Sequence, residues 1–291
     1  MLINEVALTA EESAELASEL KKQLQTGEKR KLDKNKIDLM IAGLGDPRGL
    51  MRRTFAEGLG KVGEEALPGL FQALLYSKNV TVRRAAAKTL KLVGDPSALP
   101  YLLKALINDI DPVVQGSAAG AMAIFGEKAV EPLIQVLIDP ESTEMQCGLA
   151  TWGLAFVGAE APNTIKQAAN SENEKIRAAA IAALEDQIQF LDDVEAKDLL
   201  LNALNDSSIE VRVEATKLIG RLNKKSWGES FLIKQLNDKE ELVRKNAALS
   251  LMSLNAIGSL EQLIIKISEE KNNDVIKVYE LVINQLNKNK N

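Results

Sequence analysis

The sequence contains no histidine, and among its 291 residues there is a single cysteine, Cys147. Without histidine, the chain cannot build a Ser-His-Asp or Cys-His catalytic centre or a histidine-ligated metal site of its own. One cysteine also excludes a disulfide within the chain and a zinc site made of several cysteines. We therefore expect no catalytic residue and no resident metal ion.

Strong charge, long apolar runs and aromatic side chains are also lacking. The net charge is −5, and aromatics make up 4% of the residues. Nucleic-acid binders normally carry a basic excess, so a nucleic-acid partner is not expected. No apolar run approaches the length of about 18 residues that a transmembrane helix needs. The first twelve residues do not resemble a secretory signal. These absences predict a soluble, cytoplasmic protein without a transmembrane segment.

What the sequence does contain is a repeat. A unit of about 32 residues recurs seven times, and its clearest copy begins at Val82 with VRRAAAKTLKLVGDPSALPYLLKAL. The equivalent reference positions are Arg52, Arg83, Gln115, Cys147, Arg177, Arg212 and Arg244, separated by steps of 31, 32, 32, 30, 35 and 32 residues. A fixed period of this size predicts a solenoid in which each two-helix unit packs only on its neighbours. The predicted fold is an all-α, right-handed α-α superhelix of about seven two-helix repeats with caps at both ends.

The two ends of the chain lie outside the regular repeat. Residues 1–36 are predicted to form an N-terminal capping helix and a basic linker, with Thr9 and Glu12 at the spacing of a capping box. Residues 37–291 are predicted to form the solenoid, including a C-terminal cap helix from about Asn273. Glycines such as Gly94 and Gly158 close the second helix of a unit, where a left-handed backbone is favoured.

An aspartate precedes the reference position by six residues in four units. These aspartates are Asp46, Asp109, Asp206 and Asp238. We expect each to cap a helix and to pair with a reference arginine of its own or a neighbouring unit. This predicts a structural ladder rather than a binding site.

Helical geometry predicts which residues of the second helix line the concave face. At 100° per residue, offsets 3, 7 and 10 from the reference position form the core side, and offsets 1, 2, 5 and 9 lie opposite. At offsets 1, 2, 5 and 9, the outer repeats carry charged residues and the middle repeats carry small or apolar residues. The candidate binding residues are Arg53, Arg84, Lys88, Ser117, Gly120, Ile124, Leu149, Trp152 and Phe156. The same rule puts Ala179, Ala182 and Val213 on the concave face.

Leu149, Trp152 and Phe156 form a single apolar stripe at i, i+3 and i+7. An exposed apolar patch usually marks a binding site, and Trp is enriched at interface hot spots. The alternative is that Trp152 packs in the core or is covered by the N-terminal helix. The residues alone leave both interpretations open.

The repeat string V-R-x-A-A-x-x-L-x-x-G-D-P-x-A-x-P-x-L-x-x-A-L resembles the phycobilisome (PBS) lyase HEAT-like repeat family. Residues 45–52 (GDPRGLMR) and 147–161 (CGLATWGLAFVGAEA) look most like the IscA-interacting HEAT-repeat proteins of photosynthetic bacteria. The resemblance implies an armadillo-type fold. Some family members are adaptors, and others attach linear tetrapyrroles to phycobiliproteins. Lyase subunits typically carry the motif YYAAWWLG, of which Trp152 matches one tryptophan while Gly153 replaces the second.

Three functional hypotheses follow. The first is a non-catalytic scaffold that binds a phycobiliprotein or an iron–sulfur assembly protein, such as an IscA-type scaffold, and that pairs with a second HEAT-repeat subunit. The second is a phycobilin lyase or bilin chaperone, in which Trp152 and Phe156 hold the tetrapyrrole and Arg53 or Arg84 its propionates. The third is an iron–sulfur carrier in which Cys147 supplies one thiolate and a partner the others, because a cluster needs about four ligands. Cys147 as a buried, inert residue is the alternative.

Overall fold

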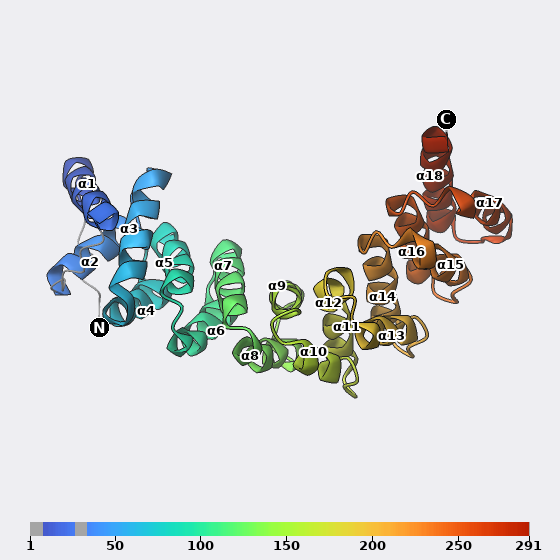
Figure 1. The fold of residues 1–291 in the computed structure, drawn as a ribbon, viewed down its shortest axis with the longest axis horizontal. Coiled ribbons are helices and arrows are strands. Elements are labelled where there is room, and N and C mark those ends of the chain that lie inside the picture. The colour runs from blue at the N-terminus through green and yellow to red at the C-terminus, as the bar shows by residue number, and fades with distance from the viewer. Residues whose placement is uncertain (1–7, 27–33, 291) are drawn as a thin grey trace. The chain divides into compact units, whose positions relative to one another are not determined.

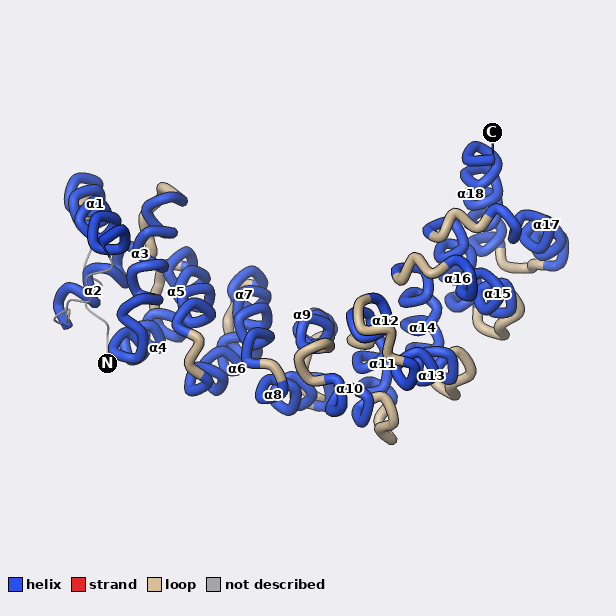
Figure 2. Tube along the Cα trace, viewed as in Figure 1, coloured by secondary structure: helices blue, strands red, loops and turns tan. Residues whose placement is uncertain are grey.

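The computed structural model describes residues 8–26 and 34–290, and these residues form helices and turns with no strand (Figures 1 and 2). The predicted linker residues 28–33 lie outside the described residues. Two compact units divide the chain between Val157 and Gly158. All of the described chain is thus the predicted all-α HEAT-like superhelix, and each unit has its own packing.

Unit 1 consists of two layers of helices. Its α-helices are α1 (Ala10–Thr26), α2 (Lys34–Gly43), α3 (Gly49–Val62), α4 (Leu67–Tyr76), α5 (Val80–Val93), α6 (Leu99–Asn108), α7 (Pro112–Met122), α8 (Glu127–Ile138) and α9 (Glu144–Val157). Short 3₁₀ helices occupy Gly63–Ala66, Pro96–Ala98 and Ala123–Phe125. The first helices α2, α4, α6 and α8 pack in one row, and the second helices α3, α5, α7 and α9 in the other.

Helix α1 extends the second row of unit 1 by packing on α3. The predicted capping box at its start is confirmed. The backbone N–H of Thr9 donates to Glu12 Oε2 at 2.8 Å, and the N–H of Glu12 donates to Thr9 Oγ1 at 3.2 Å. Helix α2 begins at Lys34, three residues before the predicted start of the repeats.

Unit 2 continues the same two-helix pattern. Its α-helices are α10 (Pro162–Ala168), α11 (Glu174–Ala182), α12 (Glu185–Gln189), α13 (Val194–Ala203), α14 (Ile209–Arg221), α15 (Lys225–Gln235), α16 (Glu241–Ser253), α17 (Leu260–Glu269) and α18 (Asn273–Lys290), with a 3₁₀ helix at Ile257–Ser259. The second helices α11, α14, α16 and α18 pack in sequence. The cap helix α18 buries Tyr279 and Leu286 completely.

Left-handed residues close the second helices of both units. Gly94 follows α5 with φ +72°, as predicted. At the same repeat position, Asn223 and Asn255 adopt φ values of +47° and +48°. Asparagine tolerates this conformation better than most non-glycine residues. Gly158, predicted to serve in the same way, is not among the residues with positive φ.

The predicted arginine–aspartate ladder is confirmed for Asp109, Asp206 and Asp238, and it runs forward along the chain. The prediction is wrong for Asp46, which pairs with Arg48 at 2.7 Å, while Arg52 donates to backbone carbonyls. The other four reference arginines each donate to a carboxylate of the following repeat. The Nε–carboxylate distances are 2.8 Å for Arg83–Asp109, 2.9 Å for Arg177–Asp206, 2.8 Å for Arg212–Asp238 and 2.6 Å for Arg244–Glu270. The aspartates accept N–H groups within the turn, such as that of Ser208 at 2.8 Å, rather than capping the next helix. The last member of the ladder, Glu270, lies in the C-terminal cap.

The ladder stops in the second half of unit 1. Gln115 keeps one half of the arginine's role by donating to the carbonyl of Asp109 at 2.8 Å, and it has no charge to pair with the next repeat. Cys147 makes only a weak contact, 3.7 Å from its Sγ to the carbonyl of Val136. A different link joins these repeats, because buried Gln146 donates to the carbonyl of Ile107 at 2.6 Å.

The concave-face rule is wrong for part of unit 2. Ala179, Ala182 and Val213 are 1%, 6% and 5% exposed and therefore belong to the core. The reason is close packing of neighbouring second helices. A Cβ at Gly220 of α14 would lie 2.6 Å from Ser250 Oγ and 2.9 Å from its Cα, so the two helices touch through these small residues.

Candidate functional site

The predicted aromatic stripe, defined as Leu149, Trp152 and Phe156 of α9, is open to solvent. Trp152 is 47% exposed and Phe156 is 59% exposed, while Leu149 is half-buried. The two rings meet edge to face, with centroids 4.7 Å apart and planes at 76°. Helix α1 packs on α3 rather than on this stripe. The two large apolar rings of the stripe are therefore exposed to solvent rather than buried in the core.

Beside the stripe, α7 contributes a floor of small residues, Gly116, Ser117 and Gly120. A Cβ at Gly120 would lie 3.1 Å from Cη2 and Cζ3 of Trp152, so the glycine makes room for the indole. Gly116 lies under Leu149, with its would-be Cβ 3.5 Å from Leu149 Cδ2. The Ser117 hydroxyl donates to the carbonyl of Val113 at 2.7 Å and so stays within its own helix. The floor therefore consists of short, uncharged side chains, and it is continuous with the stripe.

Equivalent repeat positions align these side chains in rows across α5, α7 and α9. One row consists of Leu92, Ile124 and Phe156, which are 51%, 41% and 59% exposed. A second row consists of Lys88, Gly120 and Trp152. The helices α5, α7 and α9 pack side by side in that order. We call the surface formed by these rows, with the stripe and the floor, the second-helix face of unit 1.

The α5 edge of this face carries a basic cluster, defined as Arg84 and Lys88. Both side chains are exposed, and neither forms an ion pair with any residue in the described ranges. Partial burial and the positive charges of Arg84 and Arg52 lower the pKa of Lys88. Arg52 itself donates to the backbone carbonyls of Asp46 and Pro47 at 2.6 and 2.9 Å. The cluster is thus a group of cations that have no ion-paired carboxylate among the residues that the structure describes.

Arg53 does not join this cluster as a free cation. Its Nε donates to Glu57 Oε1 at 2.7 Å, an i,i+4 ion pair on the surface of α3. Glu57 stands four residues after Arg53, so the pairing was readable from the sequence. Of the two predicted carboxylate-binding arginines, Arg84 is the one that has no ion pair within the described part of the chain.

Cys147 lies at the start of the stripe and is half-buried. Within the described residues, no group of three or more cysteine and carboxylate side chains is arranged to hold a metal ion. A shared iron–sulfur cluster at Cys147 stays a prediction.

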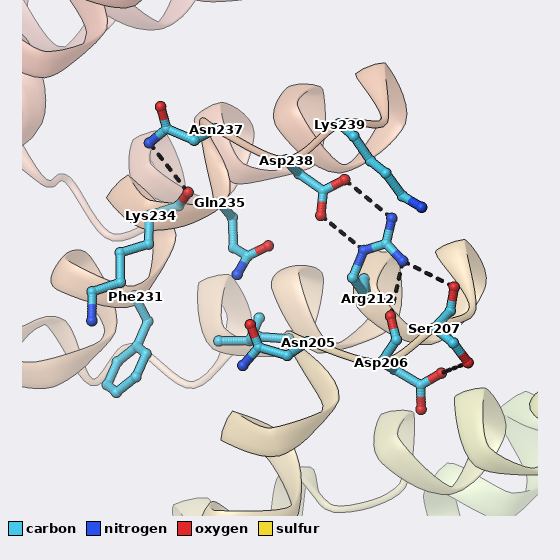
Figure 3. A pocket seen from close by; sticks show the side chains of 11 residues that line it. Asn205, Asp206, Ser207, Arg212, Phe231, Lys234, Gln235, Asn237, Asp238 and Lys239 are labelled. Carbon is cyan, nitrogen blue, oxygen red and sulfur yellow. Dashed lines mark hydrogen bonds and ion pairs between the residues drawn. The ribbon is translucent and has the colours of Figure 1, made fainter.

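A depression of about 620 Å³ lies in unit 2, between the turns that precede α14 and α16 (Figure 3). Most of the residues that line it are polar, and the ladder pair Arg212–Asp238 forms one side. Phe231 and the largely buried Gln235 line the opposite side. The depression is therefore a gap between two ladder turns, and it lies in a different unit from the aromatic stripe.

Unit 2 also contains a second Trp–Phe pair, on the first helix α15. Trp227 and Phe231 are four residues apart with planes at 76°, like Trp152 and Phe156, but their centroids are 6.3 Å apart. Lys197 Nζ lies 4.7 Å from the centroid of the Trp227 ring, and Lys234 Nζ 5.3 Å from that of Phe231. Both rings are half-buried. The same pair of residue types is thus covered by lysines in unit 2 and uncovered in unit 1.

Comparison with known proteins agrees with the repeat architecture. A model described as HEAT repeats matches residues 37–123, 67–147 and 197–278. The bilin biosynthesis protein MpeU of Synechococcus sp. (strain WH8020) is 47% identical over 281 residues, which are 97% of this chain and 95% of that protein.

Solved helical-repeat structures also match. The complex of CpcE and CpcF of phycocyanin lyase from Nostoc sp. PCC7120 contains a chain with 22% identity and a TM-score of 0.33, covering 64% of this chain and 99% of that one. Human deoxyhypusine hydroxylase matches with 18% identity and a TM-score of 0.37, covering 87% of this chain and 96% of that one.

Across the described residues, no helix combines the length and apolarity needed to cross a membrane. The HEAT-repeat match covers more than half of the chain, and the identity to the bilin biosynthesis protein extends over nearly all of it. The chain therefore belongs to the HEAT-repeat family, in the phycobilisome lyase-like group that includes this bilin biosynthesis protein.

Proposed function

We propose that this protein handles a bilin, a linear tetrapyrrole, and presents it to a phycobiliprotein for attachment. The observation that carries the proposal is the 47% identity with a bilin biosynthesis protein over 97% of the chain. Relatedness at this level along the whole solenoid favours a shared ligand class over a generic scaffold role.

The second-helix face of unit 1 is the proposed bilin site. Its two exposed rings, Trp152 and Phe156, offer edge and face contacts to a conjugated, largely apolar ligand. The small-residue floor on α7 leaves room for a flat molecule beside the indole. Large aromatic side chains of this kind commonly dominate the free energy of binding.

Attachment to a phycobiliprotein would require positioning rather than acid–base chemistry from this chain. Addition of a cysteine thiol across an exocyclic double bond of a bilin forms a C–S bond and a C–H bond, and no group leaves. Holding the bilin in one orientation beside a partner's thiol would lower the barrier through proximity. The partner phycobiliprotein and a second HEAT-repeat subunit are parts of the same proposal.

The scaffold hypothesis makes the same face a protein-docking surface. It is favoured by the exposure of Leu92, Ile124 and Phe156 in one row, a pattern typical of protein interfaces. The closer resemblance to IscA-interacting proteins, and with it a partner in iron–sulfur assembly, belongs to this hypothesis.

Bilin titration of the purified full-length protein tests the main proposal. Biliverdin is a suitable probe, because bound linear tetrapyrroles change their visible absorbance when their conformation is restricted. We expect saturable binding by the wild type and a loss of at least about tenfold in affinity for Trp152→Ala. Trp227→Ala is the matched control, because it removes a Trp–Phe pair of similar geometry from unit 2. An unshifted spectrum and no co-elution of biliverdin with the wild type would contradict the proposal.

A further inference from the structure

Taking the proposed bilin function as its basis, we infer that Arg84 and Lys88 of α5 form a carboxylate-binding subsite for the two propionate groups of the tetrapyrrole. The subsite is distinct from the aromatic stripe and lies at the other edge of the same face. It would orient the ligand, whereas the stripe would hold the body of the ligand.

The residues of the proposed site are in register across three helices. Lys88, Gly120 and Trp152 hold the same repeat position on three consecutive second helices. Neighbouring packed helices lie about 8–10 Å apart, so Lys88 and Trp152 are separated by roughly 16–20 Å. The glycine between them places no side chain in the path. An elongated ligand can therefore lie across α7 with one end on the indole and its middle within reach of the long side chains of α5.

The α5 edge of the face carries positive charge. Arg84 and Lys88 stand four residues apart on α5 without an ion pair among the described residues, and Arg52 adds further positive charge. Like charges at i,i+4 destabilise a helix when nothing compensates them. Two carboxylates at this position would relieve that repulsion. Guanidinium and ammonium groups form strong, charge-assisted hydrogen bonds with carboxylates.

The chemistry of a linear tetrapyrrole matches this arrangement of side chains. A linear tetrapyrrole is a chain of four pyrrole-type rings with a propionate on each of the two central rings. It therefore combines an extended apolar body with two adjacent negative charges. The second-helix face of unit 1 presents the complementary pattern, with apolar rings on α9, a neutral floor on α7 and two free cations on α5.

Esterification of the propionates provides the test. Full-length wild-type protein would be titrated with biliverdin and with biliverdin dimethyl ester, and both affinities would be measured by absorbance. We expect the diacid to bind at least tenfold more tightly than the diester. Arg84→Gln and Lys88→Gln should each weaken diacid binding about fivefold and leave diester binding unchanged.

Lys91→Gln is the matched control, because it removes the same charge from the exposed surface of the same helix outside the rows of the site. We expect it to preserve the preference for the diacid. Equal losses of affinity for the diacid in Lys88→Gln and Lys91→Gln would show that net charge alone causes the effect, and would overturn the subsite. Tight binding of both ligands without a preference would also overturn it, and would leave the bilin function standing. Failure of the wild type to bind either ligand would refute the bilin function itself.

Discussion

The two units use small residues on their second helices for different purposes. In unit 2, Gly220 of α14 lets Ser250 of α16 approach, and the two helices close against each other. In unit 1, Gly120 of α7 makes room for the side chain of Trp152, which remains 47% exposed. A glycine at a helix interface can thus seal a surface or open it, depending on whether its neighbour is a backbone or a flexible ring.

The two units also differ in the number of arginine–carboxylate pairs of the ladder. Three consecutive pairs, Arg177–Asp206, Arg212–Asp238 and Arg244–Glu270, connect the repeats of unit 2. In unit 1 the pair Arg83–Asp109 is followed by neutral Gln115 and then by Cys147. The repeats that carry the exposed stripe are therefore those without an ionic link to the next repeat. Unit 2 thus has an ionic link at each of its repeat boundaries with a reference arginine, whereas the second half of unit 1 has the exposed aromatic stripe and no such link among the described residues.

The largest expected effect comes from breaking the ladder. Arg212→Ala leaves the largely buried carboxylate of Asp238 without its partner, so the free energy of unfolding of unit 2 should fall by about 3 kcal/mol. Gln115→Ala in unit 1 removes one neutral hydrogen bond and should cost only about 1 kcal/mol. Urea unfolding can be followed separately in each unit, since Trp152 lies in unit 1 and Trp227 in unit 2. Equal losses of unfolding free energy in Arg212→Ala and Gln115→Ala would contradict the difference between the two units.

Substituting the two glycines should give opposite results. Gly220→Ala forces the Cβ against Ser250 and the α16 backbone and should lower stability by about 2 kcal/mol. Gly120→Ala meets only the edge of an exposed ring that can move, and alanine gains up to about 1 kcal/mol of helix propensity over glycine. We expect its melting temperature to stay level or rise, with a shift in Trp152 emission. A large fall in melting temperature for Gly120→Ala would mean that the indole is a structural element.

The sequence was sufficient for whatever depends on repeat position. The period located every second helix, and three of the four aspartates six residues before the reference position belong to the ladder, Asp46 being the exception. It was insufficient where the outcome depends on how closely helices approach. The 100° rule assumes that the side of a second helix opposite the core is free, and close packing of neighbouring second helices buries Val213 at the edge of that side in unit 2. Arg53 illustrates a local error, because Glu57 lies four residues later on the same helix and neutralises its charge in an ion pair.

Acid should weaken the ladder of unit 2. Hydrogen bonds from Arg177 and Arg244 hold the pKa values of Asp206 and Glu270 below their ordinary values of 3.8 and 4.5. A carboxyl group whose pKa is lowered by folding stabilises the fold above its ordinary pKa, and this contribution is lost as the pH falls through the folded value. We expect the stability of unit 2 to decline below about pH 4, by about 1 kcal/mol for each such group.

The control for this pH dependence is Arg244→Gln, which removes the cation that lowers the pKa of Glu270. Its overall stability should be lower, and its further loss between neutral and acid pH should be smaller than that of the wild type. An unchanged acid dependence would show that this pair contributes little charge–charge stabilisation.

The smallest expected effect tests the boundary of the basic cluster. Glu57→Gln releases Arg53 from its exposed ion pair, which is worth at most about 0.5 kcal/mol to the helix. The freed guanidinium lies on α3, the second helix next to α5, and adds a third unpaired cation beside Arg84 and Lys88. We therefore expect biliverdin to bind about twofold more tightly and the dimethyl ester to bind unchanged. A gain of affinity for both ligands would indicate a conformational effect. A gain limited to the diacid would extend the carboxylate subsite to α3. It would also show that unpaired charge, rather than helix position alone, sets the boundary of the subsite in unit 1.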